Sequence, residues 1–564
     1  MKIMNRNKFY YGILAIALVL GPVACKDQLD VGNPNAPTLD ANVITEAGLA
    51  QYAMGATYIN GFRDGSNWLG NSYFSLPWGY SEIMADNLGA SASNNQITTI
   101  GIPEYIILDD ATKILNTGSS NVGILRTYNS RAATGAGNNA LYFQWLHMYA
   151  LNAAQNSVLG RVDKIPFTGD KASKVNTIKA WCYWWKGYAY ASIGSMYIGG
   201  LIVDDALLGS NVYVTKEQII ARSDFYYNLA ITTLNAVTVD ADYTSVLNKL
   251  IPEVCKVGKG GVLSRDEWKR NINTMLARNI LVSKLAPFVN SNPNATITGS
   301  NMTAMTAADW NAIKTLTTDG VKDNDKIFTA RSSGTNSLFG AASGNVAAQS
   351  SALPSSSTFK VGERLVQYFK PADKRFTDNF FVAAAPYKGD YTYTTKWAIT
   401  QGGSGTPGVY VYASPAAGAY EVVMAASYEE NALMLAEANI RLGGATNIDA
   451  GTTLISSVRT YLGAALPALA GGLTQVQALS ELVAERRVAL VFRGLSFYDN
   501  RRWGWTYKIA NGGGSYGNKL TYQDNDNFNV TISYDFMDFW DVPADELVLN
   551  PPGAGSAPVK NEKF

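Results

Sequence analysis

The chain contains a single histidine, His147, which excludes most imidazole-dependent chemistry at the outset. Ser-His-Asp and Cys-His catalysis need an imidazole base, and zinc sites built from histidine need more than one. His147 follows Trp145 and Leu146 in a run with helical character. We therefore interpret it as a packed core residue and predict neither a metal site nor a bound cofactor.

The acidic residues show no spacing that pairs two carboxylates, as a glycoside hydrolase requires across its cleft. Segments 323–325 and 524–526 lack the glycine and the final glutamate of a calcium loop and are predicted to be solvated turns. No nucleotide-binding glycine motif is present, and a formal net charge of +1 provides no field for nucleic acid. A secreted glycoside hydrolase stays open as an alternative, because a sequence does not show cleft geometry.

Two arginines interrupt an apolar helical stripe near the C-terminus. The stripe consists of Leu479, Leu482, Val483, Arg486, Ala489, Leu490 and Arg493. A buried guanidinium must find a carboxylate or carbonyl groups, and we expect Asp499 and Glu437 to be the partners. The alternative is that the arginines clamp an anionic ligand.

The N-terminus is predicted to be a targeting segment. Lys2, Arg6 and Lys8 precede a short apolar run, so residues 1–24 are interpreted as a signal peptide. Cys25 follows Val23 and Ala24 in a pattern that resembles a bacterial lipobox, in which Cys25 is the lipid anchor; ordinary secretion is the alternative. Residues 25–40, rich in Pro and Asn, are predicted to form a lipid-anchored tether, and residues 41–564 one domain.

The body alternates helical stretches with loops rich in Gly, Ser and Asn. Capping-box spacings begin at Thr215, Ser264, Ser427 and Thr474. Further helices are predicted at about 141–160, 173–198, 306–318 and 451–463, arranged as pairs of tetratricopeptide type. Two regions, 55–107 and 329–420, lack helical patterning and are predicted to be long irregular insertions that carry binding function. Cys182 and Cys255 have no spacing that predicts a disulfide.

The most specific pattern lies in the C-terminal half. It comprises Glu485, Arg486, Arg487, Arg493, Asp499, Arg502 and Trp503 within the segments 485–494 and 497–504. Together with 427–438, 540–551 and the leader 29–35, it resembles the SusD/RagB family of outer-membrane nutrient-binding lipoproteins. Ala489 and Arg493 depart from the family, which usually has acidic residues there.

The resemblance implies a mainly α fold with a SusD-like helical scaffold and long irregular loop insertions. It implies a non-catalytic protein, anchored in the outer membrane and exposed at the cell surface. Such a protein binds a nutrient, a glycan or a peptide, and delivers it to a SusC-like TonB-dependent transporter. The resemblance also favours a scaffold role for the C-terminal motif. An architectural protein that binds a peptide or no ligand is a further alternative.

Two sets of aromatic residues could stack on the apolar face of a sugar ring, with amides at the rim. The first set is Trp68, Asn71, Tyr73, Trp78 and Tyr80, and the second is Tyr391, Tyr393 and Trp397. The alternative is that these rings pack loops onto helices. Trp181, Trp184 and Trp185, at helical spacing, are predicted to be core.

Overall fold

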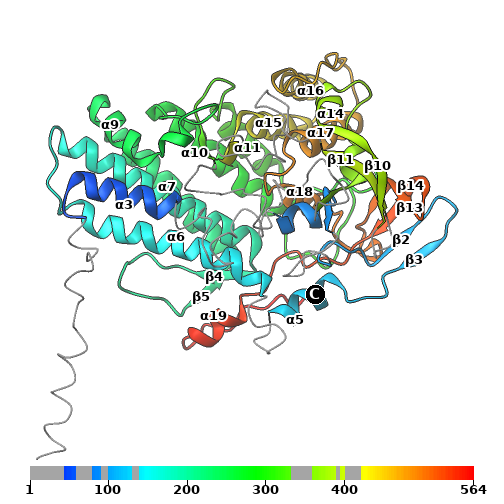
Figure 1. Cartoon of the computed structure of the whole chain (residues 1–564), viewed down its shortest axis with the longest axis horizontal. Coiled ribbons are helices and arrows are strands. Elements are labelled where there is room, and N and C mark those ends of the chain that lie inside the picture. The colour runs from blue at the N-terminus through cyan, green and yellow to red at the C-terminus, as the bar shows by residue number, and fades with distance from the viewer. Residues whose placement is uncertain are drawn as a thin grey trace, which may run out of the picture.

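The computed structural model describes residues 43–58, 79–90, 99–129, 139–331, 359–388, 394–399 and 421–564 (Figure 1). Helices dominate these residues, as the sequence predicts. The longer helices are α3 (Glu46–Tyr58), α6 (Ala140–Val162), α7 (Lys171–Met196), α8 (Lys216–Asn235), α9 (Asp240–Leu250), α10 (Arg265–Val282), α11 (Ala307–Thr318), α15 (Tyr428–Leu442), α16 (Ala445–Tyr461) and α17 (Gln475–Ala489). The shorter ones are α5 (Asn121–Tyr128), α13 (Glu363–Val366), α14 (Lys374–Asn379), α18 (Ser496–Trp503) and α19 (Ala544–Leu549).

The predicted helix starts are largely confirmed. Thr215, Ser264 and Thr474 each begin a helix with a complete capping box, which satisfies backbone N–H groups that the helix itself cannot bond. Ser427 caps α15 with its hydroxyl, but the carboxylate of Glu430 binds Arg278 and does not complete the box. Among the helices predicted without a box, only the start of α16 was misplaced: it begins at Ala445, ahead of the predicted 451.

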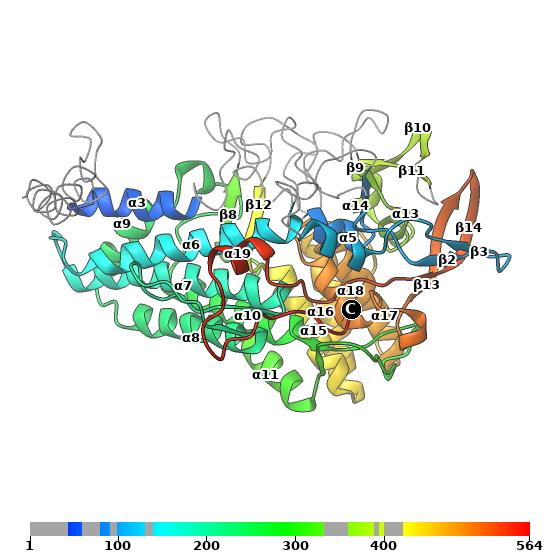
Figure 2. The ribbon, with the colours of Figure 1, turned by 90° about the horizontal axis from the view of Figure 1, so that it is seen from below.

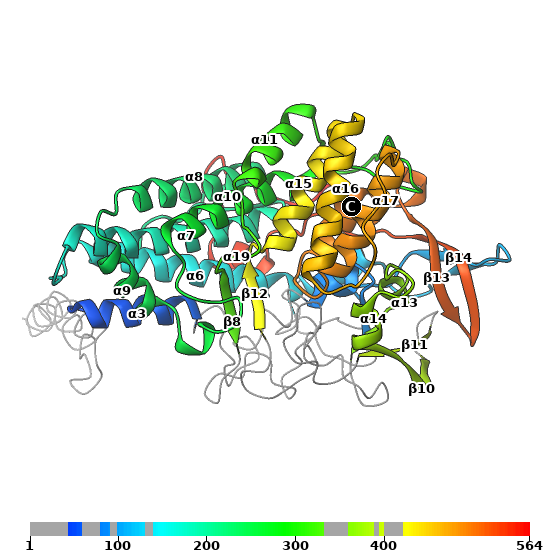
Figure 3. The same cartoon turned by 90° about the horizontal axis from the view of Figure 1, so that it is seen from above.

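The helices pack consecutively in pairs, as in tetratricopeptide-type scaffolds. On one side of the molecule α6, α7 and α8 pack side by side, and on the other α15, α16 and α17 do the same, with α10 and α11 between them (Figure 3). Each group encloses a cluster of buried hydrophobic residues.

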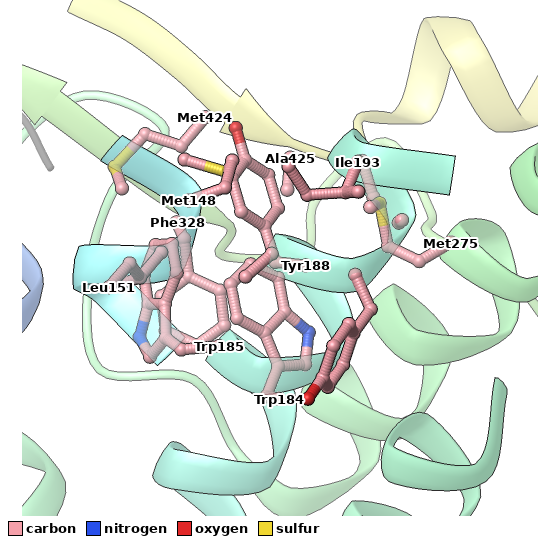
Figure 4. Close-up of a cluster of buried hydrophobic side chains, with 14 of the residues drawn as sticks. Met148, Leu151, Trp184, Trp185, Tyr188, Ile193, Met275, Phe328, Met424 and Ala425 are labelled. Carbon is pink, nitrogen blue, oxygen red and sulfur yellow. The ribbon is translucent and has the colours of Figure 1, made fainter. Parts of the chain in front are cut away.

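The first cluster is built on aromatic rings. Trp181, Trp184 and Trp185 on α7 are fully buried, which confirms their predicted core position. The ring centroid of Trp184 lies 4.5 Å from that of Trp185 and 4.7 Å from that of Phe328 (Figure 4). His147 on α6 is also buried, at 5% exposure, as expected of a core residue. Rings of this size remove a large apolar area from water and stabilise the fold accordingly.

An antiparallel sheet of six strands, which the sequence analysis did not predict, flanks the second group of helices. In the order in which neighbouring strands pair across the sheet, they are β10 (Phe380–Lys388), β11 (Thr394–Ile399), β13 (Ser515–Tyr522), β14 (Asn525–Ser533), β2 (Tyr105–Ile107) and β3 (Lys113–Leu115). Four two-stranded sheets complete the described strands: β1 (Leu88–Ala90) with β9 (Phe359–Val361), β4 (Gly199–Leu201) with β5 (Tyr213–Thr215), β6 (Lys284–Leu285) with β7 (Thr303–Ala304), and β8 (Phe328–Arg331) with β12 (Glu421–Ala425).

Two predictions need correction. The regions 55–107 and 329–420 are not free of helix, because residues 79–84 and helices α13 and α14 lie within them. These segments are too short to show a helical period. Asp325 is not solvated either: its side chain is 3% exposed and binds Arg270, with 2.7 Å between Nε and Oδ2.

Cys182 and Cys255 are buried free cysteines, with no disulfide between them. Residues 1–24, Cys25 and the tether up to residue 40 lie outside the described residues. Within the described part of the chain, no helix combines the length and apolar character needed to cross a membrane.

Candidate functional site

The charged residues of the C-terminal motif form buried ion pairs. Arg486 binds Asp499 through Nε and Nη2, at 2.9 and 3.0 Å. Arg502 donates to Asp499 at 2.8 Å and grips Glu437 with two bonds of 2.6 Å. Burial alone would raise the pKa of Asp499, but the guanidinium groups of Arg486 and Arg502 lower it. These groups neutralise one another, so they stabilise the scaffold and leave no charge for a substrate.

Glu485 and Arg487, at the start of the motif, also make buried polar contacts. Glu485 accepts hydrogen bonds from Arg375 at 2.5 Å and from Arg459 at 3.0 Å. Arg487 donates to the carbonyl of Ala85 and to the side chain of Asn87, and so joins α17 to the turn that follows residues 79–84. Trp503 is fully buried in the second hydrophobic cluster.

The predicted carboxylate partners of Arg486 and Arg493 are confirmed for Arg486 and wrong for Arg493. Asp499 does bind Arg486, but Glu437 binds Arg502, and Arg493 instead binds Glu429 at 2.6 Å. The reason is that α17 ends at Ala489, so the helical stripe does not continue to Arg493. Phe492 and Gly494, with φ of 59° and 70°, turn the chain and direct residue 493 toward the start of α15.

Of the first aromatic set, only Tyr80 is described; Trp68, Asn71, Tyr73 and Trp78 lie outside the described residues. Tyr80 is fully buried, and its ring meets that of Trp540 edge-on at 5.9 Å between centroids. It therefore has no surface for a ligand, and its proposed binding role is corrected to a packing role. The physical cause is the helical turn at 79–84, which places Tyr80 in the core.

Of the second set, Trp397 is described and Tyr391 and Tyr393 are not. Trp397 on β11 is half-buried, and one ring edge packs against Phe376 at 5.3 Å between centroids. Its neighbour across the strand pair is Val382, which is 57% exposed. Directly paired residues of antiparallel strands point to the same side. Trp397 thus belongs to a partly exposed apolar surface of the kind on which a sugar ring can stack.

Strand pairing brings the two predicted loop regions to the same side of the molecule. In the β1–β9 pair, Ala90 lies opposite Phe359, so the first region adjoins the second although they are far apart in sequence. In the β8–β12 pair, Glu421 lies opposite Arg331. Strands β8 to β12 all lie on one side of the helical body (Figures 2 and 3). The described residues that flank both candidate sets therefore share this face, which we call the strand face.

A pocket that is partly open to solvent lies between α7 and α10 on one side and the start of α15 and the turn at 493–495 on the other. Its charged lining residues are Arg278, Glu430 and Arg493. Arg278 and Glu430 form a bidentate pair, so Glu430 is not free to act as a general acid or base. The sequence analysis did not predict this pocket, because its walls come from segments as far apart in the sequence as Ser81 and Tyr498.

No metal centre is evident among the described residues, where no group of three or more His, Cys, Asp or Glu side chains converges.

The comparisons agree with the fold and the motif. The SusD family model matches residues 428–553. A SusD-like carbohydrate binding protein from Bacteroides vulgatus shares the fold with a TM-score of 0.53 and 14% identity, over 92% of this chain and 99% of that one. A SusD superfamily protein from Bacteroides thetaiotaomicron gives 0.52 and 12%, over 91% and 98%. None of the curated proteins compared with the chain matches its sequence.

The scaffold of paired helices with a strand face is therefore a SusD-like fold. The buried ion pairs of the 485–503 motif lie within the segment that the family model matches. The match of the SusD family model to residues 428–553 agrees with the resemblance that the motifs indicate. Identities of 12–14% establish a shared fold and do not identify a ligand.

Proposed function

We propose that this protein is a lipid-anchored, surface-exposed protein of the outer membrane that binds a glycan and delivers it, uncleaved, to a SusC-like TonB-dependent transporter. The observation that carries the proposal is the family match at residues 428–553 on a SusD-like fold that extends over nine-tenths of the chain. One structure with this fold is a SusD-like carbohydrate binding protein.

A binding role without catalysis is supported by the state of the carboxylates. Hydrolysis of a glycosidic bond needs two carboxyl groups that face the substrate. In the described pocket, the acidic lining residue Glu430 is held by Arg278. Glu437, Glu485 and Asp499 are buried in ion pairs with arginine. None of these carboxylates is placed to activate water or protonate a leaving group.

The first experiment separates binding from catalysis and from a purely architectural role. The purified protein is incubated with a mixture of glycans, and both retention and products are measured. We expect retention without turnover. Product formation would indicate the secreted glycoside hydrolase, and absence of both would favour the architectural protein that binds a peptide or no ligand.

The second experiment tests anchoring through Cys25. Labelled palmitate should enter the wild-type protein and not the variant Cys25→Ala, and the wild-type protein on intact cells should be sensitive to added protease. An unlabelled protein that is recovered from the medium would contradict the anchor and favour ordinary secretion.

A further inference from the structure

The pocket between α7 and α10 carries an excess of positive charge on its wall. Two guanidinium groups, of Arg278 and Arg493, face one carboxylate, that of Glu430. Behind Arg493, Glu429 is shared between Arg493 at 2.6 Å and Lys259 at 3.3 Å. The cluster therefore holds three cations and two carboxylates, and an anion that entered the pocket would meet an unbalanced positive charge.

Two further carboxylates lie behind the wall. Asp224 accepts a hydrogen bond from Asn279, and Glu82 accepts one from the backbone N–H of Gly494. Burial raises the pKa of both groups, and neither carboxylate lines the pocket.

Several polar groups of the wall lack partners among the described residues. Arg278 uses Nε and Nη2 for Glu430, and its Nη1 makes no hydrogen bond there. Asn279 is 1% exposed; its Nδ2 donates to Ser223 and Asp224, but its Oδ1 has no partner. Ser195 also lines the pocket and contributes a hydroxyl group. Asn279 Oδ1 is buried, and a buried polar atom without a partner is costly, so a ligand that bonds this oxygen recovers that free energy.

These groups define complementary chemistry. An unpaired guanidinium N–H suits a carboxylate oxygen, and an unpaired amide oxygen and a serine hydroxyl suit ligand hydroxyls. The remaining wall includes Met275, Val282 and Met424, which offer an apolar surface for C–H groups.

We propose that this pocket binds the terminal unit of an acidic glycan, a sugar ring that carries one carboxylate and free hydroxyls. The carboxylate is received on the side of Arg278 and Arg493, and the hydroxyls bond Asn279 and Ser195. This inference rests on the proposed glycan-binding function and specifies the class of glycan.

The test is isothermal titration calorimetry of the purified protein with glucuronate and with glucose, which differ by a carboxylate in place of a hydroxymethyl group. We expect glucuronate to bind at least tenfold more tightly than glucose. Equal affinities, or binding of neither sugar, would overturn the proposal.

Two variants locate the binding. Arg493→Gln removes the excess charge, and Lys259 still pairs with Glu429, so the fold is retained. The affinity of this variant for glucuronate should fall at least tenfold, and its affinity for glucose should not change. Ser195→Leu fills the pocket without touching an ion pair and should abolish binding of both sugars. Ser157→Leu is the control on the neighbouring α6, because its hydroxyl bonds only within its own helix. Unchanged glucuronate affinity in either pocket variant would overturn the proposal.

Failure of this inference is distinguishable from failure of the proposed function. If Ser195→Leu still retains acidic glycans from a mixture as well as the wild type does, the pocket is refuted and glycan binding stands. If the wild type retains no glycan, the proposed function fails, and no acidic glycan is its cargo.

Discussion

Replacing Arg486 by alanine should destabilise the protein without affecting its ligand. The substitution removes two hydrogen bonds to Asp499, of 2.9 and 3.0 Å, between side chains that are 3% and 6% exposed. Removing one partner of a buried pair costs about 3–5 kcal/mol, because a buried charge is left uncompensated. Asp499 keeps Arg502 at 2.8 Å, so we expect about 3 kcal/mol, the lower end of that range.

An unfolding entropy of about 2 cal/mol/K per residue converts this loss into a Tm lower by roughly 2–4 °C for a chain of this length. Thermal and urea unfolding followed by circular dichroism measure the effect, and calorimetry measures the ligand affinity of the folded protein.

The matched control is Arg265→Ala. Arg265 binds Asp240 at 2.9 Å, the same distance, but Asp240 is 72% exposed. Exposed pairs contribute less than about 1 kcal/mol, so the melting curve of this variant should be almost unchanged. If Arg486→Ala melts like the wild type but no longer binds ligand, the scaffold role is refuted and the clamp on an anionic ligand is favoured.

Three further predictions concern other sites. Burial opposes ionisation of Glu429, yet Arg493 and Lys259 lower its pKa to about 2. Its contribution to stability, about 3 kcal/mol from the shift below 4.5, is complete above pH 4.5 and is lost as the pH falls toward 2. Urea unfolding at stepped pH should show a smaller loss of stability in Glu429→Gln than in the wild type. Burial lowers the pKa of Lys186 to about 8, although Asp204 opposes the shift. The unfolded state therefore binds more protons than the folded state between pH 8 and 10.5, and the free energy of unfolding should rise with pH across that window. The same measurement on Lys186→Met should lack this rise. Trp397→Ala should weaken glycan retention severalfold, whereas Phe225→Ala, the loss of an exposed ring on α8, should not; equal retention by both variants and the wild type would exclude Trp397 as a binding residue.

Local signals in the sequence were sufficient for most of the longer helices. A hydroxyl at Ser264 followed by Glu267 satisfies the free N–H groups of the first turn whatever surrounds the helix, so the capping box could be recognised without a structure. The tryptophans of α7 were predicted to be core for a similar reason, since their spacing places them together on a helix. The mainly α class and the resemblance to the SusD family also followed from such local patterns.

The sheet and the ion-pair partners could not be predicted in this way. Strands β2 and β3 have three residues each, and β2 pairs with β14, more than 400 residues away, so no local period identifies them. The sequence analysis predicted Tyr80 to be a ligand contact because an aromatic ring suits both stacking on a sugar and packing in a core. Its burial in the first hydrophobic cluster decides for packing.

The sequence by itself determined that the buried arginines need carboxylates or carbonyl groups, because an unpaired charge in an apolar interior is prohibitively costly. Only the tertiary structure decided which carboxylate each one takes, since α17 ends at Ala489 and the left-handed residues that follow send Arg493 to Glu429. The same turn places Arg493 on the wall of the pocket. The sequence therefore shows which charges need a partner, and the path of the backbone determines which residue that partner is.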